Sequence, residues 1–379
     1  MTLAERLVRL SLAWLPPRLR DWGEAMAREA GSIPSDARAL LFAASCIAFA
    51  ARVGISAAVR ATSASGVNST DTSRATLQDM PGGRGVTLAC ALIATASGLV
   101  YLATAGAPSR MLSLNALAFA AGLIIVLPLS ARKPADGRFF GLVAIAAGGV
   151  LLITAGFGQQ ASGAARWISV GQVVLQPGLI LVPLLALSFA RSQDGLTVFG
   201  VALASLALAL QPGRAMAGAL LAGVAAVTIF TRNALTLLCV LMASLSLFAT
   251  CVAPDVVPAT PFVDRVFRTA FANGILPGVA VWAGAAVLLL PAVLGIIFDR
   301  EHRPAHAVFG ATWSAITLAA MLADYPAPLV SYGGSAIVGY LVCTLAMPRR
   351  WRISRKAVTP AEAEMEETGS GLLRRVCEA

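Results

Sequence analysis

The sequence predicts an all-α fold, a polytopic transmembrane helix bundle with a ten-span core and one additional N-terminal hydrophobic segment. Of the 379 residues, 58% are hydrophobic and 13% are charged, and soluble domains carry roughly twice that charged fraction. Apolar stretches of about 20 residues, the length that a helix needs to cross a bilayer, recur along the chain. The alternating segments of about ten residues that are typical of a membrane barrel are not visible.

The first 85 residues are predicted to lie outside the ten-span core. Residues 1–39 form an amphipathic extension whose first helix has one apolar face; that face carries Leu3, Leu7, Leu10 and Trp14. This helix lies on the membrane surface or packs against a partner, and a second short helix follows around 21–30. Residues 40–59 form the extra hydrophobic segment, and the Ser-, Thr- and Gly-rich residues 60–85 form a flexible linker.

The core is predicted over residues 86–347 and a cytoplasmic tail over 348–379, which is first basic and then acidic. Ten apolar stretches in the core are expected to be membrane spans: 86–106, 111–131, 139–157, 173–190, 197–211, 215–231, 234–252, 274–298, 307–323 and 331–347.

The distribution of Lys and Arg predicts the orientation of these spans. One alternate set of loops, with the tail, carries fourteen basic residues and the other set carries five. Because cytoplasmic loops are richer in Lys and Arg, both ends of the core face inward and the long loop 253–273 faces outward. The net charge of +10 therefore reflects membrane orientation and not a nucleic-acid partner.

The segment 40–59 has two possible topologies. Arg52 interrupts it, and a charge at mid-membrane costs at least about 3 kcal/mol. If the segment spans the membrane fully, the six Arg residues of the N-terminal region lie outside, against the charge rule. A re-entrant segment is the alternative.

Two Gln-Pro-Gly breaks are expected to lie in the same outer leaflet. They begin at Gln176 and Gln211, and the 35 residues between them are enough for the chain to cross inward and return. Pro177 and Pro212 each remove a helix hydrogen bond, and such breaks survive at membrane depth only where protein or a watery cavity satisfies the freed groups. Each break could alternatively just start or kink a helix.

Charged groups gather on the same predicted outer face: Arg166, Arg214, Asp255, Asp264, Arg265, Arg268 and Asp324. Several cations beside few carboxylates suit an anionic substrate handled by an acid or base, although solvated loop charges would give the same pattern. The stretch "PAPLVSYGGSA" opens onto this face. Pro326 and Pro328 hold an extended entry, and the double glycine permits close approach of backbone or ligand.

These motifs resemble those of the SEDS proteins (shape, elongation, division and sporulation). "PAPLVSYGGSA" is similar to the family's "PLPFISYGGSS", and "GAARWI" is similar to "GARRWI", keeping Arg166 and Trp167. The two Gln-Pro pairs fall where the family has "QPSELAK" and "QPDLGTA". The resemblance covers about 86–347 and identifies the chain as a divergent member, with residues 1–85 outside it.

The resemblance implies a peptidoglycan glycosyltransferase that polymerises lipid II, or another polyprenyl-diphosphate-linked precursor, outside the bacterial cytoplasmic membrane, in division or cell-shape control. A class B penicillin-binding transpeptidase is the implied protein partner. The family's "HTDFIFAVIGEELGFIG" falls on "FVDRVFRTAFANGILPG", which makes Asp264 the candidate general base. The other candidate substrate contacts are Arg166, Trp167, Arg265, Arg268, Ser331, Tyr332, Gly333 and Gly334. No cofactor is assigned, although a divalent cation is an option.

Several family residues are replaced in this chain. Ala272 and Asn273 stand at the family's Glu pair, and Gly213, followed by Arg214, stands at the Asp of the second Gln-Pro motif. The Ser, Glu and Lys of the first motif become Gly178, Leu179 and Val182. These losses leave open a catalytically degenerate scaffold or regulator of a cell-wall synthesis complex. The proline-broken spans and the cationic outer-face loops leave open, as a further alternative, a transporter of a lipid-linked precursor.

The cysteines and histidines predict no disulfide framework and no metal site. The six cysteines include no CxxC pair and mostly lie in or beside spans, so they are expected to be buried free thiols. His302 and His306 are four residues apart on an inward-facing loop, but Pro304 between them argues against a helical metal pair.

Overall fold

The computed structural model describes residues 19–34, 83–130, 136–161, 164–171, 173–253 and 258–349, together with a few isolated positions between 5 and 46. The chain divides into two compact units, Met1–Asp79 and Met80–Ala379. The predictions for Arg52, for Asp255, for most of the segments 40–59 and 60–85, and for the tail beyond 349 lie outside the described residues.

The first unit contains helix α2, Arg20–Ser32, over the stretch predicted as a short helix. Its buried residues are Gly23, Ala27 and Ala30, whose spacing of three and four puts them on one face. Ala27 and Ala30 join Val8 and Cys46 in a small apolar core.

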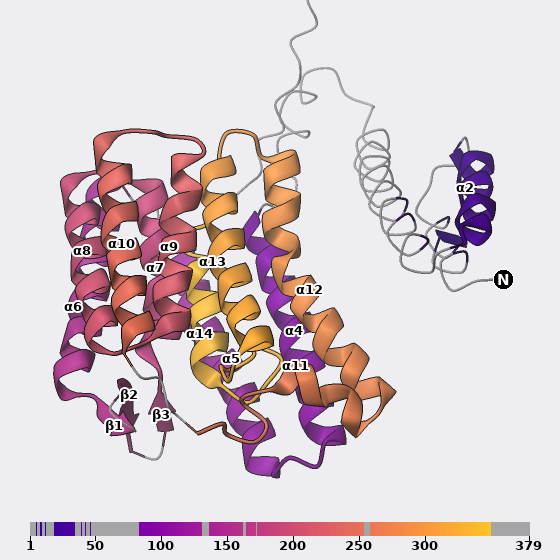
Figure 1. Cartoon of the computed structure of the whole chain (residues 1–379), viewed down its shortest axis with the longest axis horizontal. Helices are drawn as coiled ribbons and strands as arrows, with labels where there is room; N and C mark the ends of the chain where they lie inside the picture. The colour runs from indigo at the N-terminus through magenta and orange to yellow at the C-terminus, as the bar shows by residue number, and fades with distance from the viewer. Residues whose placement is uncertain are drawn as a thin grey trace, which may run out of the picture. The chain divides into compact units, whose positions relative to one another are not determined.

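The second unit is the transmembrane bundle that the sequence predicts (Figure 1). Ten of its described helices lie where the ten spans are expected: α4 Gly83–Thr104, α5 Ser109–Ser130, α6 Gly137–Phe157, α7 Pro177–Arg191, α8 Gly195–Leu210, α9 Arg214–Thr228, α10 Ala234–Val252, α12 Ile275–Phe298, α13 Arg303–Leu322 and α14 Gly334–Cys343.

Six of these helices are long and apolar enough to cross a membrane, and α7, α8, α9 and α14 are shorter. At about 1.5 Å of rise per residue, the 15 residues of α7 cover less than the roughly 30 Å of a hydrocarbon core. Backbone outside a helix at that depth must be buried in protein or line a cavity. The chain beyond the ends of the short helices must meet one of these two conditions.

A small antiparallel sheet was not predicted from the sequence. It consists of β1 Gln159–Ala161, β2 Ala164–Val170 and β3 Val173–Leu175. Its last strand occupies the start of the span expected at 173–190, so the helix begins four residues later, at Pro177. A short apolar Val-rich run fits a strand or a helix start equally well.

The long loop after α10 contains two short turns of helix, α11 Val266–Thr269 and η3 Ala270–Asn273. Figure 1 shows α11 and the three strands at the same end of the bundle.

An aromatic cluster in the core fixes α14 against its neighbours. Trp313 and Phe309 of α13 lie with ring centroids 5.1 and 5.2 Å from the ring of Tyr340, and the Tyr340 hydroxyl donates to the carbonyl of Leu288 at 2.7 Å. A Cβ on Gly339 would lie 2.2 Å from a backbone oxygen of α7. This close packing sets the position of the Ser-Tyr-Gly-Gly segment that precedes α14.

The described cysteines are free thiols. Cys46, Cys90, Cys239 and Cys343 are buried, whereas Cys251 near the end of α10 is exposed.

Candidate functional site

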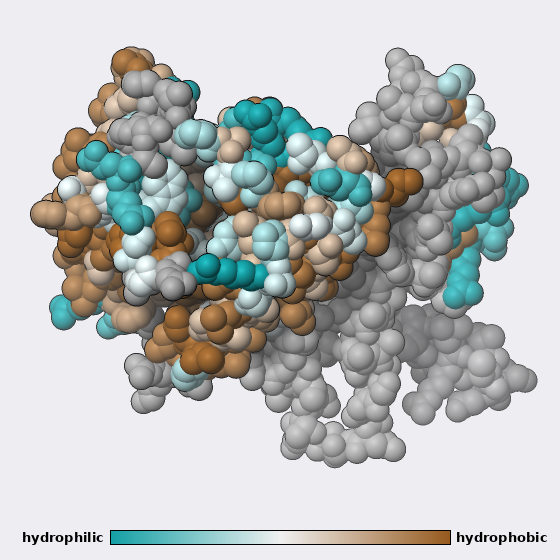
Figure 2. Space-filling view, turned by 90° about the horizontal axis from the view of Figure 1, so that it is seen from below, coloured by the Kyte–Doolittle hydropathy of each residue, from teal (hydrophilic) through white to brown (hydrophobic). Residues whose placement is uncertain are grey.

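A cavity of about 780 Å³ collects most of the residues that the sequence singles out. The predicted residues that line it are Gln176, Arg166, Trp167, Asp264, Arg265, Arg268, Pro326, Tyr332, Gly333 and Gly334. They come from β2, from the loop after α10, from the residue before α7 and from the segment that joins α13 to the first residue of α14. Figure 2 looks onto this end of the bundle and shows hydrophilic residues gathered among the apolar ones.

The loop that carries Asp264 is tied to the segment before α14 by two backbone hydrogen bonds. The Ala327 N–H donates to the Val263 carbonyl at 3.3 Å, and the Tyr332 N–H donates to the Phe262 carbonyl at 2.9 Å. These bonds place Asp264 beside the Ser-Tyr-Gly-Gly segment, although 67 residues separate Asp264 from Ser331 in the sequence.

The same two segments contain strained backbone. Phe262, Arg265 and Leu329 have φ angles of 63°, 61° and 61°, which are uncommon for residues other than glycine. Such conformations persist only where the surrounding structure imposes them, and they cluster at functional sites.

The Asp264 carboxylate is half-buried, and one of its two oxygens has a hydrogen-bond donor within the described part of the chain. Its Oδ2 accepts a hydrogen bond from the Thr260 N–H at 2.8 Å, and its Oδ1 bonds to no described residue. Burial raises the pKa of this carboxyl, with a further contribution from the negative charge of Asp324, while the Thr260 bond and Arg265 act in the opposite direction. A raised pKa makes the carboxylate a better proton acceptor.

Asp324, which follows α13, holds both arginines of the Asp264 loop. Arg265 Nε donates to Asp324 Oδ1 at 2.7 Å, and Arg265 Nη2 donates to Oδ2 at 2.5 Å. Arg268 Nη2 donates to Oδ1 at 2.9 Å. The bonds from Arg265 lower the pKa of Asp324. Asp324 is one of the charges that the sequence places on the outer face, but no role for it was predicted.

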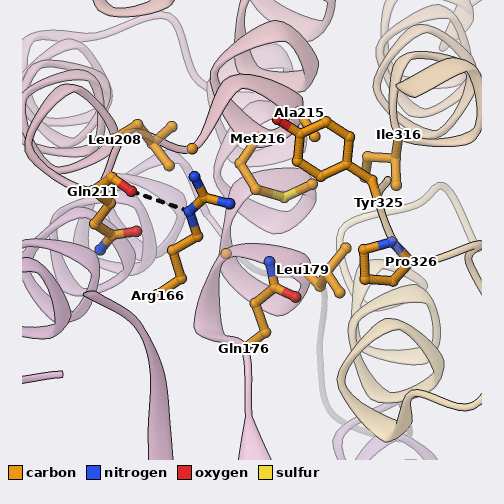
Figure 3. Close-up of a pocket in the computed structure, with 12 residues that line it drawn as sticks. Arg166, Gln176, Leu179, Leu208, Gln211, Ala215, Met216, Ile316, Tyr325 and Pro326 are labelled. Atoms are coloured by element: carbon orange, nitrogen blue, oxygen red, sulfur yellow. Dashed lines mark hydrogen bonds between the residues drawn. The ribbon is translucent and has the colours of Figure 1, made fainter. Parts of the chain in front are cut away.

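Arg166 donates to backbone carbonyls at the break between α8 and α9. It is 6% exposed, and its guanidinium donates to the carbonyls of Gln211, at 3.1 Å, and Pro212. Gln211 in turn donates from Nε2 to the Leu151 carbonyl at 2.7 Å. Figure 3 shows Arg166 directed toward Gln211, in a small cavity of about 20 Å³ that Gln176 also lines. A substrate contact for Arg166 stays a prediction.

The two Gln-Pro-Gly motifs do lie together, and both mark helix ends. α7 begins at Pro177, and the second motif separates α8 from α9. Arg214, the first residue of α9, donates to the carbonyls of Thr250 and Ala253 at 3.0 and 2.8 Å. Its guanidinium thus satisfies the carbonyl end of α10.

Ser331 supports its own segment. Its side chain is buried and donates from Oγ to the Ala327 carbonyl at 2.6 Å. Pro328 is also buried, and neither residue lines the large cavity. The Gln176 N–H donates to Ser335 Oγ at 2.8 Å, which joins the starts of α7 and α14.

Asn115 of α5 is a residue that the sequence analysis missed. It is fully buried; its Nδ2 donates to the Ser331 carbonyl at 2.9 Å and its Oδ1 accepts from the Gly333 N–H at 3.1 Å. An Asn inside a mostly apolar span was the available signal, because buried polar groups at membrane depth are expensive and need partners.

The opposite end of the bundle holds a separate Asp-His cluster. His302 Nδ1 lies 3.0 Å from Asp299 Oδ1, and His306 Nε2 lies 3.2 Å from Asp299 Oδ2. Among the described residues, no group of three or more His, Cys, Asp or Glu side chains is arranged to hold a metal ion.

The helices define a multi-pass helical membrane protein. Its fold is that of RodA. A crystal structure of an aspartate-to-alanine mutant of the Thermus thermophilus rod shape determining protein RodA matches with a TM-score of 0.50 and 19% sequence identity, over 70% of this chain and 97% of that one. A chain from a structure on the coordination of polymerization and crosslinking by a peptidoglycan synthase complex matches with a TM-score of 0.50 and 21% identity, over 69% of this chain and 94% of that one. No protein-family model matches the sequence, and no curated protein is significantly similar to it.

Proposed function

We propose that the protein is a SEDS-type peptidoglycan glycosyltransferase that polymerises lipid II at the outer face of the bacterial cytoplasmic membrane. The observation that carries the proposal is that one cavity brings together Asp264, two arginines of its loop and the Tyr332–Gly334 backbone. The RodA fold and the sequence motifs support it.

Asp264 is the general base in this proposal. A hydroxyl of the acceptor sugar attacks the anomeric carbon of the donor, the bond from that carbon to the diphosphate oxygen breaks, and the hydroxyl proton goes to Asp264 Oδ1. The Thr260 N–H holds the other carboxylate oxygen and so fixes the orientation of the base. Such positioned general bases contribute typically about 10²- to 10⁴-fold to a rate.

Arg265 and Arg268 are the diphosphate contacts in this proposal. Their charge stabilises the leaving diphosphate as negative charge develops on it, and guanidinium groups match phosphate oxygens through paired N–H donors. A divalent cation could do the same work, but the described donor set fits one poorly: the Asp324 carboxylate is bonded to both arginines. We therefore assign no step to a metal.

The proposal is tested by polymer formation from labelled lipid II, with the purified full-length protein alone and with a class B penicillin-binding transpeptidase. We expect glycan polymer from wild type and none from Asp264→Asn. Asp136→Asn is the matched control, because Asp136 caps α6 outside the cavity lining and Asn caps a helix equally well. Absence of polymer from the wild type under both conditions would refute the proposal.

A catalytically degenerate scaffold for a cell-wall synthesis complex is the second candidate. It is favoured by the engagement of both loop arginines with Asp324 and by the lack of a second acidic residue at Ala272 and Asn273. In that case Asp264→Asn would restore growth to a deletion strain as well as wild type does, whereas a base in the reaction could not be replaced.

A further inference from the structure

We propose that Asp324 is a positioning residue that orients the guanidinium groups of Arg265 and Arg268 into one cradle for the diphosphate of a lipid-linked substrate. This inference rests on the proposed function for the identity of its ligand. It goes beyond that function because it gives a role to the Asp324 carboxylate, which contacts no reacting atom.

A single carboxylate bonds to both cations. Arg265 precedes α11 and Arg268 lies in its last turn, so the two arginines are three residues apart on the same short element. Asp324 comes from the end of α13. It takes two bonds from Arg265 and one from Arg268, at 2.5 to 2.9 Å.

The bonds to Asp324 leave most of the arginine donors available. A guanidinium has five N–H groups; Arg265 uses two on Asp324 and Arg268 uses one. The remaining N–H groups bond to no described residue, and the two side chains are 54% and 48% exposed. Two arginines and one carboxylate retain one positive charge, so the trio attracts an anion.

The shared carboxylate orients the two guanidinium groups and adds little to the stability of the fold. Salt bridges between exposed side chains contribute little to folding stability, so stability alone does not explain a carboxylate shared by two arginines. Without Asp324 the two cations would repel each other and sample many rotamers. Ordering each such side chain on binding weakens the affinity by roughly two- to twelvefold, a loss that a fixed pair avoids.

The other arginines that line the cavity donate to backbone carbonyls at helix ends. Arg166 donates to carbonyls at the end of α8, and Arg214 donates to carbonyls at the end of α10. Arg265 and Arg268, by contrast, donate to the carboxylate of Asp324.

Asp324 also acts on Asp264 through space. Its negative charge raises the pKa of the Asp264 carboxyl, whereas Arg265 lowers that pKa. The other charged residues that line this cavity are Arg166, Arg214 and Arg268. Replacing Asp324 by Asn would therefore move the acidic limb of an activity profile to lower pH, a change that loss of a structural contact would not produce.

The test measures binding of undecaprenyl diphosphate to the full-length protein in nanodiscs, with inorganic diphosphate and phosphatidylglycerol as separate probes. We expect Asp324→Asn to weaken binding of the lipid diphosphate about tenfold, as two side chains must then be ordered on binding. Asp324→Glu should keep binding within about threefold, because it can make the same charge-assisted bonds, and Asp136→Asn should leave binding unchanged.

The outcomes separate the positioning role of Asp324 from the assigned ligand and from the proposed glycosyltransferase function. Equal affinity of Asp324→Asn and wild type would overturn the inference, and tighter binding would overturn it as well, since Asp324 would then compete with the ligand. If Asp324→Asn does not fold, Arg265→Gln takes its place and must weaken binding. Binding by wild type without polymer formation would defeat the proposed glycosyltransferase function alone, and preference for phosphatidylglycerol would defeat the assigned ligand.

Discussion

Replacing Asn115 by Ala should loosen the Ser-Tyr-Gly-Gly segment and with it the candidate site. Asn115 makes two hydrogen bonds to that segment, at 2.9 Å to the Ser331 carbonyl and at 3.1 Å from the Gly333 N–H. Interhelical hydrogen bonds in membrane proteins contribute about 0.6 kcal/mol on average, and a buried polar group left without a partner costs about 1–3 kcal/mol. For two bonds we expect a loss of about 1–6 kcal/mol.

Hydrogen exchange in detergent is the assay, read at the amides of residues 329–334. The Gly333 amide reports directly, because the substitution removes its acceptor. At the expected loss, exchange there should speed up at least about fivefold, since 1.4 kcal/mol is a factor of ten in an equilibrium constant. Asn273→Ala is the control: Asn273 is exposed and makes one bond at 3.3 Å to the Thr269 carbonyl. Unchanged exchange at Gly333 in Asn115→Ala would refute the reasoning.

Three further predictions concern packing, capping and pH. Gly98→Ala should reduce the yield of folded protein, because its Cβ would lie 2.5 Å from the Leu329 carbonyl oxygen; a normal thermal unfolding midpoint would contradict this. Arg166→Lys should lower the free energy of unfolding by about 2 kcal/mol in chemical unfolding, since a lysine cannot donate to two carbonyls in the fork geometry of a guanidinium. An unchanged denaturation midpoint would exclude the capping role. Polymerisation should decline as pH falls through the pKa of Asp264, which lies above its ordinary value. In Asp324→Asn the decline should begin at lower pH, because removing a negative neighbour favours the ionised base. Coincident pH profiles of the variant and wild type would count against coupling of the two carboxylates.

The spans could be predicted because they follow from length and composition alone. An apolar run that is long enough to cross the bilayer has few other solutions, and the ten helices fall in the expected places. The strand at 173–175 was missed because Val-Val-Leu continues the apolar pattern of the following helix, and periodicity does not separate the two at that length.

The pairings within the site could not be predicted. Asn115 lies 216 residues from the Ser331 carbonyl that it binds, and Arg265 lies 59 residues from Asp324. Composition shows that a polar side chain in a span needs a partner, but only the packing of the helices says which partner. Arg166 illustrates the same limit: its sequence neighbourhood suggests an anion contact, and its position adds a capping role at the end of α8.

The proposed role of Asp264 as general base is tested most directly by the rate of glycan polymerisation by purified Asp264→Asn beside wild type and the Asp136→Asn control. Only Asp264→Asn should lose activity, by at least about 100-fold, as expected for removal of a general base. Polymerisation by Asp264→Asn at the wild-type rate would contradict this role.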